Sequence, residues 1–459
     1  MNRWFLASRL SRGLLPLLLL AAASPVASSA EAQVPTVVAE IPYDPPVDVI
    51  GDALAGLTLQ KAVLLMRHGV RPPTSTPKFQ IYADAPFPSD WGVPDGDLTA
   101  PGAALVSTIG TFDRAAYAVQ GLLPASGCPR PGDMFVWANN ADERTEATGQ
   151  ALVQGLFPGC GLHAGYSASS TADPLFTAPY PEDTAALSDA VLAHIGGSFQ
   201  PIQAGAAAVL SDLNRVLGCC STALCQSAIG ATACTIASLP YAITPSGNTL
   251  SFTGGLLTGS SLAEIFELEY ANGFTGTDVA FGRTGEAGIR SLMRLYTAKY
   301  RLFDRTPALA RATGSNLALQ MLDAIEGGAG TIVPGGPPAG RVTIFVGNDT
   351  TQSAVGGLLN LDWHQQSFNT DDMPPGGALG FELLKDRVGR FFVRPVFVTM
   401  TLDQMHAGKP LRLNNVPLYE GLALPGCEYR GGRLCSLSRF ASIVTASIQP
   451  SATGPISYR

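Results

Sequence analysis

Three short apolar runs, each of which stops at charged or polar residues, constrain the fold of this chain more than any other feature. They span residues 61–66, 134–138 and 342–346 of a chain of 459 residues. Their length and their continuous apolar character are typical of strands buried on both faces of an α/β sheet. A further β segment is expected late in the chain, over residues 391–400.

Helical spacing of apolar residues dominates the chain between these runs, which favours a sheet flanked by helices. Thr306-Pro307 is a typical helix start, because proline is well tolerated in the first turn. The stretch 181–305 is mainly helical, so we expect an inserted helical domain there. It divides an α/β domain made of residues 31–180 and 306–459. The expected helices span residues 142–157, 182–195, 203–217, 261–271, 285–302 and 306–325.

The first 30 residues have the pattern of a secretory signal peptide. Arg3, Arg9 and Arg12 precede a short apolar run over residues 14–23, and small residues follow as far as Ala30. The run is too short to span a bilayer comfortably, which favours a cleaved signal over an anchor. We therefore expect residues 1–30 to be removed, leaving a periplasmic or secreted protein without a membrane partner.

Eight cysteines, an even number behind an export signal, predict disulfide bonds made in an oxidising compartment. Four of them lie between residues 219 and 234, where three pairings are open. Their spacing differs from that of a zinc ribbon and no histidine lies among them, so we expect disulfides there rather than a metal. The eight are Cys128, Cys160, Cys219, Cys220, Cys225, Cys234, Cys427 and Cys435.

The overall charge disfavours a nucleic-acid partner. The chain carries 29 basic and 36 acidic side chains, a net charge of −7, and it has no basic run. A nucleic-acid surface needs many clustered cations. Any site for an anion must therefore be a local cluster of positive charge.

Such a cluster is predicted at the ends of the three apolar runs. In open α/β sheets, ligands bind at the carboxyl ends of the strands. Side chains that follow different strands can therefore meet in one cleft. The residues that follow the three runs are Arg67, His68 and Arg71, then Arg144, and finally Asn348 and Asp349.

These residue types fit phosphoryl transfer. The planar guanidinium of arginine matches two phosphate oxygens. The imidazole of His68 can attack phosphorus and form a phosphohistidine. Asp349 can protonate the leaving oxygen and then activate water. Because the guanidinium charges stabilise the transition state, we expect neither a metal nor another cofactor. Of the remaining histidines, His194 is expected to be a solvated or hydrogen-bonded residue of a helix, and the others are expected at the surface, namely His163, His364 and His406.

The motif Arg67-His68-Gly69-Val70-Arg71-Pro72-Pro73-Thr74 resembles the signature of the histidine acid phosphatase family, and specifically its bacterial periplasmic branch of phytases and glucose-1-phosphatases. This resemblance implies a phosphoglycerate-mutase-like fold, in which helices flank a central mixed sheet and a helical domain is inserted. It extends over most of the chain after the signal. Further matching segments are residues 141–145, 173–176, 262–266, 305–307, 356–358, 374–377, 425–427 and 435–437.

The resemblance also implies roles for single residues. His68 matches the family nucleophile and Asp349 matches its proton donor. Thr74 and Glu264 resemble positions that contact substrate in the phytases. Arg67, Arg71 and Arg144 match the phosphate-binding arginines. The disulfides implied are Cys128 with Cys160, Cys427 with Cys435, and Cys225 with Cys234, which leaves Cys219 and Cys220 unassigned.

Two positions depart from the family pattern. Asn348 stands where the family has a histidine that touches the bound phosphate, and an amide can donate a hydrogen bond but cannot carry a positive charge. We therefore expect an active enzyme whose phosphate binding depends less on pH than is usual in the family. Ser75 stands where the bacterial phytase has a lysine, which weakens the case for phytate as the preferred substrate.

The predicted function is that of an exported phosphomonoesterase acting on small phosphate monoesters, with phytate and sugar phosphates as candidate substrates. Residues 91–99 and 270–274 look closer to the glucose-1-phosphatase, whereas the His68 motif looks closer to the phytase. One alternative is a phosphate-ester binding protein that has lost catalysis through Asn348. Another is a phosphotransferase of the phosphoglycerate mutase type, which the export signal and the cysteines disfavour.

Overall fold

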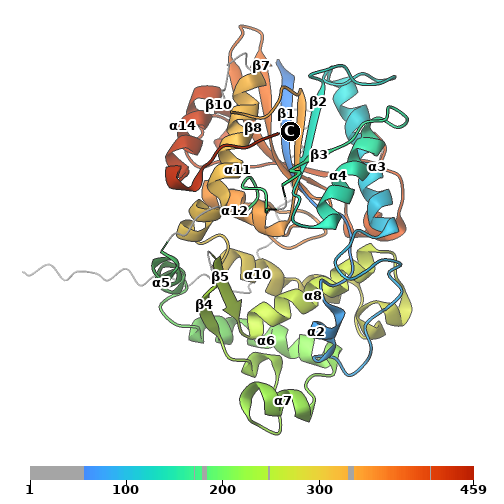
Figure 1. Cartoon of the computed structure of the whole chain (residues 1–459), viewed down its shortest axis with the longest axis vertical. Coiled ribbons are helices and arrows are strands. Elements are labelled where there is room, and N and C mark those ends of the chain that lie inside the picture. Colours follow the sequence, from blue (N-terminus) through green and yellow to red (C-terminus); the bar gives the residue numbers. More distant parts are fainter. Residues whose placement is uncertain are drawn as a thin grey trace, which may run out of the picture. The chain divides into compact units, whose positions relative to one another are not determined.

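The computed structural model describes residues 56–169, 171–177, 183–246, 249–328, 335–413 and 415–458. The predicted signal peptide and the segment that follows it up to residue 55 lie outside the described residues. Most strands belong to one sheet of eight (Figure 1). Their order across the sheet is β10 (Cys435–Ser436), β8 (Phe391–Thr399), β7 (Ala378–Asp386), β1 (Leu57–Arg67), β6 (Val342–Gly347), β2 (Met134–Ala138) and β3 (Gly165–Tyr166), and β9 (Leu418–Gly421) also pairs with β8.

The sheet is mixed, as the resemblance implied. β1 lies at its centre and pairs in parallel with β6 and antiparallel with β7. β2 and β3 continue the parallel half, whereas β8, β9 and β10 continue the antiparallel half. β6 is buried along its whole length, as expected of a strand covered on both faces. The prediction of an α/β fold built on a mixed sheet is therefore confirmed.

The register brings the three predicted strand ends to one edge. Arg67 lies opposite Gly347 across the pair of β1 and β6, and Ala138 lies opposite Val346 across the pair of β2 and β6. Because the three strands are parallel, the residues that follow each of them leave the sheet on the same side.

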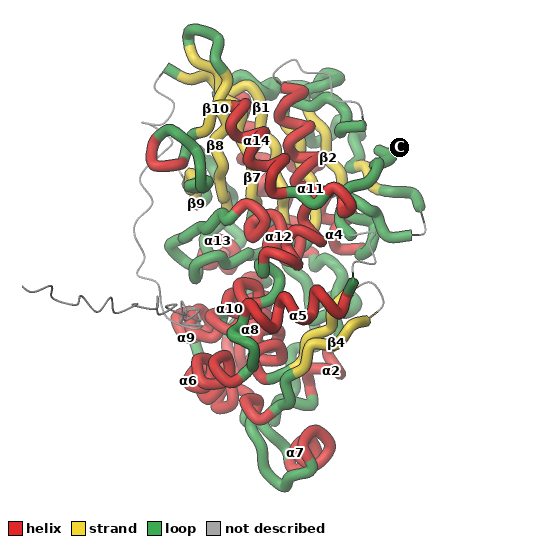
Figure 2. Tube along the Cα trace, turned by 90° about the vertical axis from the view of Figure 1, so that its left-hand side faces the viewer, coloured by secondary structure: helices red, strands yellow, loops and turns green. Residues whose placement is uncertain are grey.

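Helices cover both faces of the sheet (Figures 1 and 2). Successive side chains of β1 point to opposite faces of the sheet, as in any strand. Leu64 and Met66 pack towards α3 (Ala100–Val119) and α4 (Glu143–Leu156). Val63 and Leu65 pack with the apolar side chains of the other face, which is covered by α11 (Pro307–Gly328), α12 (Asp349–Leu359) and α14 (Leu437–Ser447).

Helix α3 was not predicted, although Thr99 caps it by accepting a hydrogen bond from the Gly102 backbone N–H. Two glycines weaken its helical pattern, and the structure shows why one of them is needed. A side chain at Gly110 would place Cβ 2.5 Å from the carbonyl oxygen of Leu152, and one at Gly155 of α4 would place Cβ 2.1 Å from that of Ser107. The glycines therefore allow α3 and α4 to approach closely.

The segment predicted as an inserted helical domain is indeed mainly helical in its described residues, with one hairpin. The predicted helix over residues 285–302 is two helices, which meet at Met293. Buried side chains of this segment share one apolar core with α11 and α12, so the division at residues 181 and 305 stays a prediction. The elements are α5 (Thr184–His194), α6 (Gln200–Leu217), α7 (Thr222–Ile229), β4 (Ala242–Ser246), β5 (Thr249–Thr253), α8 (Gly255–Ala271), α9 (Glu286–Leu292) and α10 (Arg294–Leu302).

Two short helices complete the elements. α2 (Thr76–Gln80) precedes the helical segment in sequence, but its Phe79 belongs to the same apolar core. α13 (Leu402–Ala407) follows β8.

Among the described residues, no helix combines the length and the apolar character that crossing a bilayer requires.

The eight cysteines form four disulfides. Three of these pairs, Cys128–Cys160, Cys225–Cys234 and Cys427–Cys435, are those implied by the family resemblance. The fourth joins the adjacent Cys219 and Cys220, which the sequence analysis left unassigned. The four pairs leave no free cysteine in the described chain.

Candidate active site

The turn that follows β1 is held by backbone contacts from several sides. The His68 N–H donates to the Gly347 carbonyl at 3.0 Å, and the His68 carbonyl accepts from the Gly376 N–H at 3.1 Å. The Gly69 N–H donates to Thr148 Oγ1 of α4 at 3.0 Å. A side chain at Gly69 would place Cβ 2.8 Å from Leu98, so glycine is the residue that fits. These contacts fix the position of the His68 ring.

His68 is buried, and its ring has a defined tautomer. Nδ1 lies 2.8 Å from the carbonyl oxygen of Gly69. Because a carbonyl only accepts, Nδ1 carries the hydrogen and Nε2 keeps its lone pair. Burial, followed by the positive charges of Arg67 and Arg71, holds the pKa of His68 well below its usual range. The ring is therefore neutral near pH 7, the form in which an imidazole is nucleophilic.

Two of the predicted arginines share one carboxylate. Arg67 Nη2 and Arg71 Nη2 both donate to Oε1 of Glu264 on α8, the latter at 3.1 Å. Arg67 is fully buried, also donates to the Met373 carbonyl, and lies 3.2 Å from Asp349 Oδ2. A buried guanidinium needs such compensation, because an isolated charge is strongly destabilised away from water. Glu264 thus holds both guanidinium groups in place.

Each of the three predicted arginines also keeps a buried Nε–H. In Arg67, Arg71 and Arg144 this group has no hydrogen-bond acceptor among the described residues. An unpaired buried donor costs about 1–3 kcal/mol. Three such donors around one histidine are typical of a site whose ligand is an oxyanion such as phosphate.

Arg144 lies in the first turn of α4. Its Nη2 donates to Asp142 at 2.7 Å, and its Nη1 donates to the Gly96 carbonyl at 3.3 Å. Burial, followed by the positive charge of Arg71, lowers the pKa of Arg144. Thr74 is exposed and lies against the same Gly96, at which an added Cβ would be 3.7 Å from both Thr74 Cα and Arg144 Nη1. Thr74 therefore lies at the rim of the arginine cluster.

Asp349 is the first residue of α12. Its Oδ2 accepts a hydrogen bond from the Tyr296 hydroxyl at 3.0 Å, and its Oδ1 accepts from the Thr350 N–H at 2.8 Å. Burial favours the neutral acid, but the charges of Arg67 and Lys299 outweigh it, so the pKa of Asp349 lies well below its usual range. Asp349 is thus a carboxylate in the free protein.

Asn348 has a structural role that the sequence analysis missed. Its Oδ1 accepts from the Thr351 N–H at 3.0 Å, and Thr351 Oγ1 accepts from the Asn348 N–H at 3.0 Å. This reciprocal pair is a capping box, and asparagine is among the best residues for the N-cap position. Asn348 therefore starts the helix that presents Asp349, and its Nδ2 is left to donate to a ligand.

Several residues beside the site gave no signal in the sequence. Tyr296 of α10 contacts Asp349, but it lies within an ordinary helical pattern. Gln352 ties α12 to β1 by donating to the Leu65 carbonyl at 2.8 Å. Glu267 and Asp372 are buried near Arg67. Burial, followed by the charge of Asp372, raises the pKa of Glu267 well above its usual range, and burial raises that of Asp372 to about 7.

The other histidines lie outside these contacts. His163 and His194 are exposed, as predicted. His364 and His406 are half-buried. The His406 ring stacks on that of Tyr270 at 4.1 Å between centroids, which covers much of its surface.

The chain is similar to known proteins in sequence and in structure. A profile of the histidine phosphatase superfamily (branch 2) matches residues 58–193. The phytase AppA of Escherichia coli (strain K12) is 33% identical over 419 residues, which cover 86% of this chain and 94% of that protein. The glucose-1-phosphatase of Salmonella typhimurium is 26% identical over 406 residues, which cover 85% and 93%.

Solved structures give a matching result. The Hafnia alvei phytase in complex with tartrate aligns with a TM-score of 0.79 at 32% identity, and the alignment covers 87% of this chain and 100% of that one. The same phytase in complex with myo-inositol hexakis sulphate aligns with a TM-score of 0.78.

Proposed function

The chain belongs to the histidine phosphatase superfamily (branch 2) and is a phosphomonoesterase, and we propose that it works through a phosphohistidine at His68 with Asp349 as proton donor. The observation that carries this proposal is the neutral, buried imidazole of His68 beside three arginines with unpaired Nε–H groups. A phosphate monoester supplies the oxygens that these donors lack. The guanidinium groups then hold phosphorus in front of Nε2.

In the first step, Nε2 of His68 attacks phosphorus while the bond from phosphorus to the ester oxygen breaks. A bond between nitrogen and phosphorus forms, and the ring becomes positively charged. The Nδ1–H, which donates to the Gly69 carbonyl at 2.8 Å, stabilises that charge. The leaving oxygen takes a proton from Asp349 and departs as an alcohol.

In the second step, water attacks phosphorus and gives a proton to the Asp349 carboxylate. The bond between nitrogen and phosphorus breaks, which restores the neutral imidazole and releases inorganic phosphate. The arginines bind the three equatorial oxygens in both steps, so the same cluster serves both transition states.

The low pKa of Asp349 decides when it can act as an acid. In the free protein, Arg67 and Lys299 keep it ionised. A bound phosphate neutralises the same guanidinium groups, which raises the pKa of Asp349. Since the second pKa of a phosphate monoester is about 6, a monoanionic substrate brings a proton with it in acid solution. We therefore expect the highest activity at acid pH.

Trapping the intermediate tests the role of His68. Rapid quenching with a ³²P-labelled substrate, followed by peptide mapping, should place the label on His68. His68→Ala should give no label and lose at least about 10⁴-fold in kcat, as expected when a nucleophile is removed. His163→Ala, which removes an exposed histidine, is the matched control. A labelled His68→Ala protein would overturn the proposal.

The relatives favour catalysis over the alternative of a protein that only binds phosphate esters, because they are named as enzymes. Asn348 can still donate through Nδ2, and Arg67, Arg71 and Asp349 are all present. A protein that bound esters without turnover would give neither label nor released phosphate in the trapping experiment.

We expect phytate and sugar phosphates among the substrates. The relatives at 32–33% identity are phytases, whereas the glucose-1-phosphatase matches at 26%. Glu264 and Thr74 lie at the arginine cluster, but Ser75 supplies no cation, and Lys78 is exposed one helical turn further on. We therefore expect a higher kcat/KM for phytate than for glucose 1-phosphate. Release of phosphate from phytate, glucose 1-phosphate and an aryl phosphate, compared by kcat/KM, tests this order. A lower kcat/KM for phytate than for glucose 1-phosphate would reverse it.

We also propose export to the periplasm or the medium. Four disulfides in the described chain favour an oxidising compartment. Expression of the full chain in a bacterial host, followed by fractionation and N-terminal sequencing, should give a mature protein that begins near Glu31. An intact N-terminus in the membrane fraction would refute the cleaved signal.

A further inference from the structure

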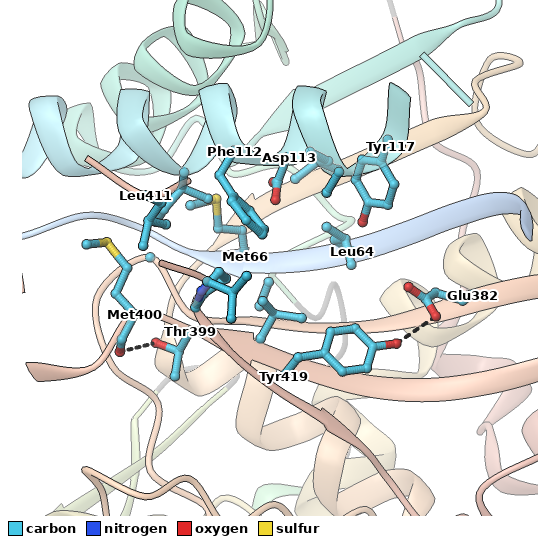
Figure 3. A pocket seen from close by; sticks show the side chains of 18 of the residues that line it. Leu64, Met66, Phe112, Asp113, Tyr117, Glu382, Thr399, Met400, Leu411 and Tyr419 are labelled. Atoms are coloured by element: carbon cyan, nitrogen blue, oxygen red, sulfur yellow. Dashed lines mark hydrogen bonds between the residues drawn. The ribbon is translucent and has the colours of Figure 1, made fainter. Parts of the chain in front are cut away.

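A cavity of about 320 Å³ lies beneath α3, on the face of β1 that Leu64 and Met66 line (Figure 3). Its walls are α3 on one side and β1, β7, β8 and β9 on the other, and Leu411, Leu413 and Val416 also line it. A volume of this size is typical of sites for small organic molecules.

Most of the wall is apolar. Met66, Phe112, Met400 and Leu411 gather at one end of the cavity in Figure 3. Methionine is unbranched and polarisable, so it adapts to apolar ligands of different shape. This end suits a hydrocarbon or aromatic group.

Glu382 and Tyr419 lie towards the other end, and Asp113 lies on the α3 wall between Phe112 and Tyr117 (Figure 3). Two carboxyl groups and one guanidinium group, that of Arg394, thus line the cavity. Glu382 of β7 is compensated, because Arg394 Nε donates to its Oε2 at 2.8 Å and the Tyr419 hydroxyl donates to it at 2.7 Å. Asp113 of α3 also lines the cavity, and no hydrogen bond or ion pair reaches it from the described residues. Among the described residues, the carboxyl group of Asp113 thus has no counter-ion.

The environment of Asp113 favours the neutral form of its carboxyl group. Burial raises the pKa of Asp113 to about 7. Tyr117 from α3, Glu382 from β7, Arg394 from β8 and Tyr419 from β9 are the titratable groups that line the same cavity. Arg394 is already paired with Glu382, so the cation that would stabilise an ionised Asp113 has to come from elsewhere.

We propose that this cavity binds an amphipathic organic amine, with its apolar body among Met66, Phe112 and Leu411 and its ammonium group against Asp113. A carboxylate or phosphate ligand would meet Asp113 and Glu382 with the same sign of charge, so it is disfavoured. A neutral ligand would leave Asp113 without a counter-ion.

The cavity is accessible and separate from the arginine cluster. Three of the lining residues are exposed, namely Val119 at 76%, Leu413 at 56% and Val416 at 45%. Gly376 lines the cavity, and its N–H donates a hydrogen bond to the His68 carbonyl. None of the three arginines of the cluster lines the cavity. The amine therefore binds without displacing phosphate.

The test compares 4-phenylbutylamine with 4-phenylbutanol, which has the same body and an uncharged head group. Isothermal titration of the full-length protein at pH 8 should show the amine binding about tenfold more tightly than the alcohol or better. The affinity for the amine should fall as the pH is lowered through about 7, because Asp113 becomes protonated. Saturating phosphate should leave the affinity unchanged.

Two variants and one control make the test decisive. Asp113→Asn should remove the preference for the amine but keep phosphatase activity, and Ala116→Trp should abolish binding of both probes by filling the cavity. Asp189→Asn, on the exposed face of α5, is the matched control and should behave as the natural protein. Equal affinities for amine and alcohol, or full amine affinity in a folded and active Asp113→Asn protein, would overturn the proposal.

Discussion

Asp349, at the carboxyl edge of the sheet, is buried, and Asp113, in the cavity beneath α3, is half-buried, but their pKa values move in opposite directions. Burial alone raises the pKa of Asp113 to about 7. At Asp349 burial acts in the same direction, but Arg67 and Lys299 reverse its effect and hold the pKa low. The difference teaches that the placement of cations, more than burial, decides which carboxyl group stays ionised.

The largest effect is expected from Asp349→Asn, which removes the proposed proton donor while keeping the shape of the side chain. The kcat for a sugar phosphate should fall by about 10²–10⁴-fold. It should fall less for an aryl phosphate, because a phenolate leaves without protonation. Steady-state kinetics with both substrates measure this, and Asp113→Asn is the control that should change neither. An equal loss on both substrates would contradict the role of Asp349 as an acid.

The contact from Tyr296 sharpens the comparison, because its hydroxyl donates to the Asp349 carboxylate at 3.0 Å. This hydrogen bond stabilises the charged form, so Tyr296→Phe raises the pKa of Asp349. If Asp349 must be protonated to act, the alkaline limb of the kcat profile should move to higher pH, by up to about one unit, with a loss of kcat of about tenfold or less. Tyr419→Phe, which loses a similar contact with Glu382, should leave the profile in place.

Asp113 should affect stability rather than catalysis. Its folded-state pKa of about 7 lies above the ordinary value of 3.8, so ionisation disfavours the folded state. Ionisation of Asp113 therefore does not affect the free energy of unfolding below about pH 4. It lowers this free energy progressively as the pH rises from there towards 7. Asp113→Asn should raise the free energy of unfolding at pH 8 by about 1–2 kcal/mol relative to its effect at pH 4. Urea unfolding at the two pH values measures this, and an effect independent of pH would refute it.

The smallest effect is expected at Asn348, where two roles compete. Asn348→His should lose the N-cap of α12 and about 1 kcal/mol of stability. It should also strengthen product inhibition by phosphate below about pH 6.5, where the new imidazole becomes charged. Urea unfolding and inhibition constants across the pH range measure the two effects.

Asn348→Asp is the matched control, because aspartate also caps helices well but brings a negative charge. It should keep the stability of the natural protein and bind phosphate more weakly. If Asn348→His proved as stable as the natural protein, the capping role would be wrong.

Strands β1, β2 and β6 of the parallel half, and the meeting of polar residues at their ends, could be predicted from the sequence, whereas the two-residue strand β3 was not. The buried strands β1, β2 and β6 carry continuous apolar runs, and Arg67, Arg144 and Asp349 follow them at a point where the chain becomes polar. Strand β7 and helix α3 were not predicted. In α3, Gly110 allows close packing against α4 and Gly102 allows close packing against the Val70 backbone, and both glycines lower the helical propensity. The contact of Tyr296 with Asp349 joins residues 53 positions apart, and no local pattern marks it.

By itself, the sequence determined which side chains the cluster can contain, because the residue types of Arg67, His68 and Arg71 and their spacing follow directly from the chain. It also implied three of the four disulfides through the family resemblance. Only the tertiary structure decided the electrostatic state of each group. Glu264, Lys299 and Tyr296 come from distant helices to set the charge around Arg67 and Asp349, whereas no cation of the described residues forms an ion pair with Asp113. Charge interactions depend on distance in space, and a linear pattern does not contain those distances.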